Sequence, residues 1–297
     1  MKLCVMEKII VAEKTVESYL TKSKIGQFAI NPYVGCPHAC KYCYASFMKR
    51  FTGHSESWGD FVNIKQARHT INGSQITGKN VFMGTVTDCY NPHEAKYGIT
   101  RSILEQLVGV DCYLQIATKN KLILRDLDLL KKMKHLSVAL SVNTLDENFR
   151  RDMDRASTVQ ERLETLRTLH ENGIYTILFM SPIFIGITDW KAIIETSRSF
   201  VSEYWFEDLN LRGGYKSVIM QYVQGYYPDS YPLFKRIYVQ GDKTPLTEME
   251  NEIIAYCHDN DILFSDYFHH EEVIRNPQNK ILGKMNKKEL LQTICKK

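Results

Sequence analysis

The chain has 297 residues, 44% of them hydrophobic, a size that suits one α/β barrel or two smaller domains. A formal charge of +4 and a pI of about 8.5 make it mildly basic, too weak a bias to demand a nucleic-acid partner. No stretch reaches the ~18 to 20 apolar residues of a membrane span, and the scattered cysteines do not form a secreted disulfide framework. We therefore expect a soluble cytoplasmic protein without membrane contact.

Residues 1–26 mix short apolar runs with Lys and Glu, and we interpret them as an N-terminal lead-in segment. After them, apolar runs too short for helices alternate with segments that carry apolar residues at helical spacing. Turn-forming residues bound most of these runs. The runs predict strands at 28–34, 81–86, 113–117, 137–142, 174–180 and 204–209.

The segments between the strands predict helices. One is opened by Ser157 and Gln160 as a capping box and stopped by Gly173, and another is capped by Asp189. A further helix is expected to open at Thr247, whereas the stretch 226–233 has an irregular pattern. The other helices are expected at 44–51, 100–108, 126–133 and 215–223.

Six strands with long crossovers between them imply a parallel sheet, and right-handed crossovers curve such a sheet towards a barrel. Six strands are fewer than the eight that close a barrel. No linker or repeat separates the last part of the chain. We therefore predict a single α/β fold, a partial (β/α)6 TIM-type barrel over 27–214, with a helical C-terminal extension over 215–297 packed on this core.

Cys36, Cys40 and Cys43 stand in one short stretch with the spacing C-x3-C-x2-C, and thiolates this close together predict a metal site. Thiolates select iron–sulfur clusters, zinc or Cu(I). A cubane cluster needs one ligand per iron, so three cysteines leave one iron open to a chelating small molecule. The alternative is a zinc knuckle with His38 or a distant group as fourth ligand, although zinc sites favour paired C-x2-C or C-x2-H units.

Polar residues follow the apolar runs at the predicted strand ends. In a parallel barrel the functional groups lie at the carboxyl ends of the strands, although any strand can end in a polar residue. Arg212 follows the last strand and precedes Gly213 at a helix start, where backbone donors could also hold an anion. The residues at strand ends are Thr87, Asp88, Lys119, Ser141, Asn143, Ser181 and Asn210.

With Tyr42 before its third cysteine, the cysteine stretch resembles the signature of the radical S-adenosylmethionine (radical SAM) enzymes. Further strings resemble the branch that contains spore photoproduct lyase: TDCYNPHE at 87–94, TKNKLILRDLDLL at 118–130, LSVNTLDE at 140–147 and SPIFIGITD at 181–189. With NLRGGYK at 210–216 and YFHHEE at 267–272 added, the chain is similar to the group called radical SAM mobile pair protein B.

The resemblance implies an enzyme in which Cys36, Cys40 and Cys43 hold a 4Fe-4S cluster and S-adenosylmethionine (AdoMet) completes it. Reductive cleavage of AdoMet then gives a 5′-deoxyadenosyl radical, with electrons from a donor of the flavodoxin or ferredoxin type. The implied substrate is a nucleic-acid base or nucleotide, so nucleic acid and a partner radical SAM protein are candidate partners. The alternatives are radical modification of a peptide or partner protein, and a non-catalytic metal-binding or redox-sensing module.

The resemblance also assigns site residues one by one. Lys119 and Ser141 match residues that hold the AdoMet carboxylate and ribose region, and a cation at Lys119 suits a carboxylate. Asn210 and Arg212 are candidates for binding the substrate. The full set expected at the cofactor is Tyr42, Thr87, Asp88, Lys119, Ser141 and Asn143.

One position departs from the resemblance. Photoproduct lyases carry a hydrogen-donating cysteine three residues before the aspartate that ends the second strand, and this chain has Thr85 there. A hydroxyl O–H bond is too strong to give up hydrogen readily to a carbon radical, whereas a thiol S–H can. Cys89 is the candidate donor at the same strand end, and the alternative is that it is a buried, inert thiol.

Overall fold

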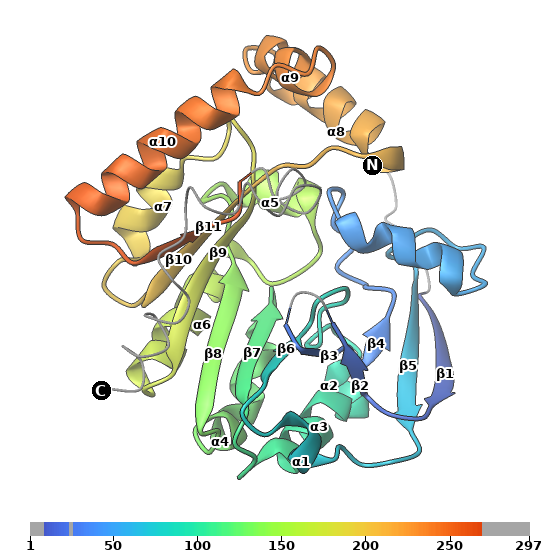
Figure 1. Cartoon of the computed structure of the whole chain (residues 1–297). Coiled ribbons are helices and arrows are strands. Elements are labelled where there is room, and N and C mark those ends of the chain that lie inside the picture. Colours follow the sequence, from blue (N-terminus) through green and yellow to red (C-terminus); the bar gives the residue numbers. More distant parts are fainter. Residues whose placement is uncertain (1–8, 24–25, 269–297) are drawn as a thin grey trace.

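A computed structural model gives the fold and describes residues 9–23 and 26–268. Its main sheet has eight strands in the order β11-β10-β9-β8-β7-β6-β3-β2 (Figure 1). All neighbours in it run parallel except β2 and β3, which are antiparallel. The strands are β2 (Leu20–Lys22), β3 (Phe28–Ile30), β6 (Asn80–Met83), β7 (Tyr113–Thr118), β8 (His135–Ser141), β9 (Tyr175–Ile183), β10 (Glu203–Asp208) and β11 (Phe264–Asp266).

The predicted parallel sheet is confirmed. Strands β3, β6, β7, β8, β9 and β10 overlap the six predicted runs, although β6 ends at Met83, and each pairs with its neighbour in that series. Within the described residues, β2 and β11 end the sheet without pairing with each other, so the barrel is partial as expected. The first predicted strand is divided, because β3 ends at Ile30 and the next strand, β4 (Tyr33–Val34), belongs to a second sheet.

The second sheet has three strands in the order β1-β5-β4 and was not predicted. Strand β1 (Ile10–Val16) runs parallel to β5 (Phe61–Ala67), and β4 pairs antiparallel with β5. The lead-in segment therefore contributes β1 to this sheet and β2 to the main sheet. The chain changes sheets between β3 and β4, directly before the first cysteine of the metal motif, so both sheets fix where that motif begins.

Helices fill the crossovers and the C-terminal part. Helices α8, α9 and α10 lie together at one end of the molecule, as the predicted helical extension requires, and α10 passes beside α7 (Figure 1). Trp190 of α7 and Tyr256 of α10 have ring centroids 5.4 Å apart. The division into a core and an extension stays a prediction.

The helices are α1 (Gly73–Ile76), α2 (Glu94–Tyr97), α3 (Ile99–Leu107), α4 (Leu127–Leu130), α5 (Glu147–Met153), α6 (Val159–Glu171), α7 (Trp190–Ser197), α8 (Gly213–Tyr226), α9 (Tyr231–Tyr238) and α10 (Thr244–Asp259), with 3-10 helices η1 (Tyr44–Phe51) and η2 (Lys121–Asp126).

Two helix starts differ from the predictions. The capping box of α6 is formed by Thr158 and Glu161, one residue later than predicted. The Thr158 side chain accepts from the Glu161 amide, and the Glu161 side chain accepts from the Thr158 amide. Helix α10 begins at Thr244 rather than Thr247, with Pro245 in its first turn. The stretch expected to be irregular contains the start of α9. No helix in 9–23 or 26–268 has the length and apolar character to span a bilayer.

The two faces of the main sheet have different environments, because successive residues of a strand point to opposite faces. One face packs under the helices and contributes Leu140, Leu178 and Phe206 to the large core cluster. The other face carries a smaller cluster around Ala139, Ile177 and Trp205. We call the side of the sheet that carries this second cluster the inner face of the partial barrel. The same side carries further residues towards the carboxyl ends of the strands.

Candidate active site

The cysteine loop joins β4 to η1 and is fixed by backbone contacts. The Lys41 amide donates to Met153 O at 2.9 Å, which ties the loop to the end of α5. Gly35 precedes the first cysteine with φ of +85°, and a Cβ at this position would lie 2.4 Å from Phe61 O. Only glycine allows both this conformation and this close approach to β5. The loop geometry therefore depends on neighbours in α5 and in β5 of the small sheet.

The three cysteines of the loop are unpaired thiols, with Cys36 buried and Cys40 and Cys43 partly buried. Burial raises the pKa of all three, that of Cys36 to about 12, so a bound metal must displace their protons. In the part of the chain that the structure describes, no three His, Cys, Asp or Glu side chains converge on one ion position. A cubane cluster does not require such convergence, because each of its thiolates binds a different iron.

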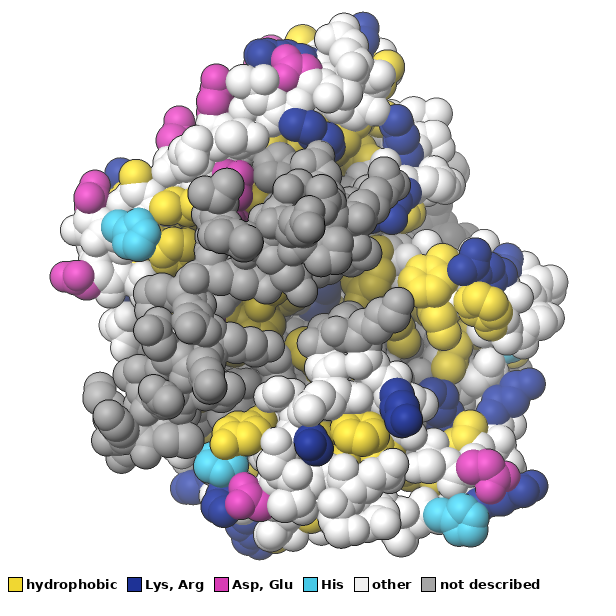
Figure 2. Space-filling view, viewed as in Figure 1, with side chains coloured by type: hydrophobic (Ala, Val, Ile, Leu, Met, Phe, Trp, Pro, Cys, Tyr) yellow, Lys and Arg dark blue, Asp and Glu magenta, His cyan; other side chains and the backbone are white. Residues whose placement is uncertain are grey.

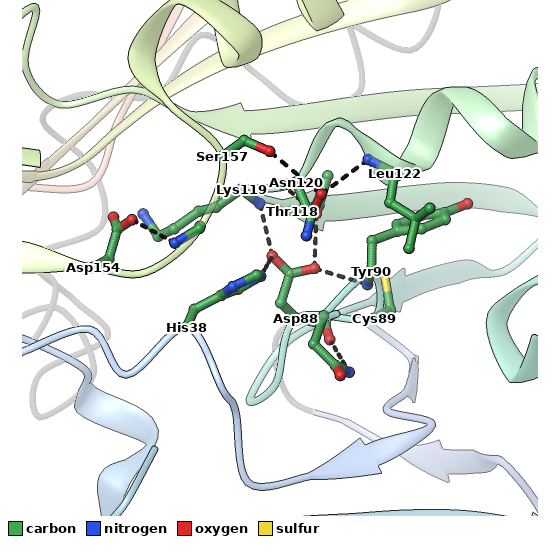
Figure 3. A network of polar contacts seen from close by, with 12 residues as sticks. His38, Asp88, Cys89, Tyr90, Thr118, Lys119, Asn120, Leu122, Asp154 and Ser157 are labelled. Carbon is green, nitrogen blue, oxygen red and sulfur yellow. Dashed lines mark hydrogen bonds and ion pairs between the residues drawn. The ribbon is translucent and has the colours of Figure 1, made fainter. Parts of the chain in front are cut away.

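Asp88 is the centre of a polar network at the ends of β6 and β7 (Figure 3). His38 Nε2 lies 3.0 Å from Asp88 Oδ2, and the Lys119 amide donates to the same oxygen at 2.8 Å. Thr118 Oγ1 and the Tyr90 amide donate to Asp88 Oδ1 at 2.7 and 2.8 Å. Burial would raise the pKa of Asp88, but His38 and these donors outweigh it and lower that pKa below its ordinary value.

This network gives His38 a partner inside the protein. Because His38 lies in the cysteine loop and Asp88 follows β6, their contact holds the loop against the carboxyl end of the main sheet. His38 was the candidate fourth ligand of a zinc site, and its contact with Asp88 favours a positioning role instead. Direct contact between Asp88 and AdoMet stays a prediction.

Lys119 places a buried ammonium group beside the cysteine loop. Its Nζ has no hydrogen-bond partner among the described residues and lies 5.4 Å from the centroid of the Tyr42 ring. Burial lowers the pKa of Lys119, because the charged form loses hydration. A buried cation is costly unless an anion pairs with it. The position fits the carboxylate of a bound ligand.

Behind Lys119 lies a buried ion pair that the sequence did not reveal. Arg162 of α6, only 1% exposed, donates to Asp154 and also to Ser141 O at 3.2 Å. The Tyr42 hydroxyl donates to Asp154 Oδ2 at 3.3 Å, while its ring packs edge-on against Phe184. Burial would raise the pKa of Asp154, but the Arg162 guanidinium outweighs it and lowers that pKa. The pair thus connects the cysteine loop to the end of β8.

Three other predicted cofactor residues have different surroundings. Asn143 Nδ2 donates to Pro182 O at 3.0 Å, and Thr188 Oγ1 donates to Asn143 O at 2.9 Å, so Asn143 joins the ends of β8 and β9. Thr87 Oγ1 is buried without a partner in the described ranges, which leaves it able to bind a ligand. Ser141 is the last residue of β8 and is partly exposed on the inner face. Their contacts with AdoMet stay predictions.

The remaining predicted residues are Cys89 and the pair Asn210 and Arg212. Cys89 is fully buried in the large core cluster, with Sγ 4.0 Å from Ala117 O, and Figure 3 draws it on the opposite side of Asp88 from His38. Burial raises the pKa of Cys89, and this environment favours the inert-thiol alternative, while the donor role stays a prediction. Arg212 Nε donates to Asn210 Oδ1 at 2.9 Å directly before α8.

Glu207 is a partly buried acid on the inner face that sequence reasoning missed. It lies in β10, two residues after Trp205 and therefore on the same face, and Ser181 Oγ of β9 donates to its Oε2. Burial raises the pKa of Glu207, and Ser181 and Lys119 offset this only in part. The alternation of β10 could have placed Glu207 on the inner face, had the facing of the strand been known.

Comparison with known families decides the class of protein. The family model described as the radical SAM superfamily matches residues 30–196, which include the cysteine loop and β3 to α7. The chain belongs to the radical SAM superfamily. It is therefore a radical SAM enzyme, and its cofactors are a 4Fe-4S cluster and AdoMet. The sequence resemblance is confirmed at the level of the superfamily.

Relatives of this radical SAM enzyme share sequence over different extents. An uncharacterized protein of Methanocaldococcus jannaschii is 35% identical over 244 residues, 82% of this chain and 90% of the relative. An uncharacterized protein of Acidianus two-tailed virus is 33% identical over 170 residues, 53% of this chain and 56% of the relative.

Among solved structures, spore photoproduct lyase complexed with dinucleoside spore photoproduct superposes with a TM-score of 0.53 at 16% identity. The match covers 71% of this chain, which spans 65% of the length of that lyase. Identity this low supports the shared fold and carries over neither activity nor substrate.

Proposed function

We propose that Cys36, Cys40 and Cys43 bind the cluster of this radical SAM enzyme, that Lys119 pairs with the AdoMet carboxylate, and that the substrate is a nucleic-acid base or nucleotide. The observation that carries the proposal is the buried Lys119 Nζ, which has no partner among the described residues and lies beside the loop with three free thiols. A buried cation next to a thiol cluster suits a ligand that brings a carboxylate to the open iron.

When bound, the cluster and AdoMet supply a 5′-deoxyadenosyl radical by one-electron reduction of the sulfonium. The residues of the chain bind and orient. Asp88 holds the Lys119 amide at 2.8 Å and the His38 ring at 3.0 Å, so it fixes the ammonium and the cysteine loop relative to each other. The Ser141 carbonyl accepts a hydrogen bond from Arg162, and in this proposal the Ser141 side chain would meet the ribose. The inner face excludes water from the radical.

The inner face supports a nucleobase as substrate. Glu207 and Ser181 place a carboxyl and a hydroxyl side by side, and Ser181 is the hydrogen-bond partner of Glu207 among the described residues. A carboxyl group accepts from base N–H groups, as Glu and Asp do when they read cytosine N4. Spore photoproduct lyase, which shares the fold, was solved with a dinucleoside photoproduct. Electrons would come from a donor of the flavodoxin or ferredoxin type.

Anaerobic reconstitution tests the proposal. Wild type should bind about four irons per chain and form 5′-deoxyadenosine from AdoMet with dithionite as reductant. Cys36→Ala, Cys40→Ala and Cys43→Ala should each lose the cluster and this activity. The matched controls are Cys112→Ala and Cys257→Ala, which remove buried free thiols far along the chain. Equal iron loss in both sets, or a colourless zinc protein, would contradict the assignment. Two further non-motif cysteines, Cys4 and Cys295, lie outside the described residues.

A further inference from the structure

The 3-10 helix η1, which follows the cysteine loop, exposes an unusual number of aromatic side chains. Tyr44 is 57% exposed, Phe47 44% and Phe51 67%. A 3-10 helix has three residues per turn, so Tyr44, Phe47 and Arg50 lie along one face. Large apolar side chains gathered in one exposed patch mark interaction sites more often than chance. We call Tyr44, Phe47, Arg50 and Phe51 the aromatic track.

Positive charge is part of the track. The Arg50 guanidinium lies 5.4 Å from the Phe47 ring centroid and 4.7 Å from that of Phe51. Lys49 and Arg50 occupy the last turn of η1, and the helix YASFMKRF contains no acidic residue. Figure 2 shows hydrophobic and basic side chains gathered at the place of this helix, beside a hollow in the same face. Aromatic rings with a cation between them suit a flat, negatively charged partner.

The track leads to the proposed active site. Although the Tyr44 ring is exposed, its hydroxyl points inward and donates to Thr85 O at the end of β6. Tyr44 itself follows Cys43 directly in the chain. The track therefore runs from the mouth of the barrel outward along η1.

We propose that the aromatic track binds single-stranded nucleic acid by stacking its bases, so that a neighbouring base can enter the inner face. This inference rests on the proposed substrate class and specifies a base presented in a strand rather than a free nucleotide. Proteins that bind single strands combine basic side chains along the backbone with aromatic rings on which bases stack. The bases of a duplex are stacked on each other, so their faces are not free for Phe47 and Phe51.

Fluorescence anisotropy tests the track with the reconstituted holoenzyme and a labelled single-stranded DNA of about a dozen nucleotides. Base stacking on one aromatic ring is lost in Phe47→Ala and in Phe51→Ala, and each should weaken binding by about fivefold to 150-fold. Arg50→Gln removes the cation of the track and should also weaken binding. Its matched control is Arg167→Gln, because the Arg167 guanidinium likewise lies over a ring, 4.3 Å from the Phe200 centroid, but on α6. Arg167→Gln should bind like wild type, and the same DNA as a duplex should bind more weakly.

Equal affinity of wild type, Phe47→Ala and Phe51→Ala, or no binding by wild type, would overturn the inference. If Phe51→Ala instead slows reduction of the cluster by reduced flavodoxin, while DNA binding and reduction by dithionite are unchanged, the track is a docking surface for an acidic electron carrier and the inference is also wrong. Iron content and 5′-deoxyadenosine formation with dithionite are measured without DNA. A failure of the proposed function is therefore distinguishable from a failure of the track.

Discussion

Replacing Lys119 by Met separates a ligand-binding cation from a structural one. The Lys119 Nζ is buried and makes no hydrogen bond within the described residues, so Lys119→Met removes its contact with the Tyr42 ring but no hydrogen bond, and it relieves the desolvation of a charge. The free energy of unfolding should stay equal or rise. AdoMet affinity should fall, because a charge-assisted hydrogen bond of about 1.5–3 kcal/mol is lost, which is roughly tenfold to a hundredfold in Kd.

Both quantities can be measured on one preparation. Calorimetric titration with AdoMet gives Kd for the reconstituted protein, and urea unfolding gives the stability of the same variant. The matched control is Lys121→Met, two residues along, because Lys121 is 59% exposed and its contact is an ion pair with Glu161 at 2.6 Å. Exposed ion pairs contribute about 0–1 kcal/mol to the free energy of unfolding, so Lys121→Met should unfold nearly like wild type. Because the Lys121 ammonium is exposed and pairs with Glu161, this control should leave AdoMet affinity unchanged.

The opposite pattern would refute the assignment. If Lys119→Met binds AdoMet like wild type and unfolds more easily, the ammonium group braces the fold and does not meet a ligand carboxylate. Loss of affinity together with loss of iron would mean that Lys119 acts through the cluster, so iron content is determined for each variant.

Three further predictions concern buried groups. Arg162→Met should cost about 3–5 kcal/mol of unfolding free energy, because Asp154 is left buried without its cation. Since the folded pKa of Asp154 is lowered, the pair stabilises wild type above the ordinary carboxyl pKa and loses this effect as the pH falls through the folded pKa, so urea midpoints of wild type and variant should converge in acid. Asp88→Asn weakens the hold on His38 and should lower iron retention on gel filtration, whereas full retention would contradict its positioning role. Cys89→Ala should keep cluster and 5′-deoxyadenosine formation, and unchanged product formation on an identified substrate would exclude the donor role.

The main sheet could be predicted because its signals are local. Each buried strand is a short apolar run, and the crossovers between the runs imply parallel neighbours. The small sheet was missed because β1 has the sequence IVAEKTV and is mostly exposed, so its pairing with β5 leaves no alternation of apolar and polar residues. Backbone pairing between distant segments has no signature in either segment alone.

The same distinction holds in the site. Cys36, Cys40 and Cys43 are close together in sequence, so their spacing alone indicated a metal site. The contact of Ser181 with Glu207 joins residues from different strands, and nothing in either segment marks the partner. Asn143 is a polar strand end whose amide donates to the backbone of Pro182, a contact that its own sequence position does not indicate, and its contact with AdoMet stays a prediction.

The chain order of the strands has a consequence for synthesis. From β6 to β10, each strand of the main sheet pairs with one supplied by an adjacent βα unit, so these contacts close short loops at low entropic cost. A nascent chain can extend this sheet unit by unit as it leaves the ribosome. The cysteine loop lies in the chain between β1 and β5, and these two strands can pair before β6 has been synthesised. A chain that stops there carries three reactive thiols without Asp88 and Lys119, the residues that later cover and position them.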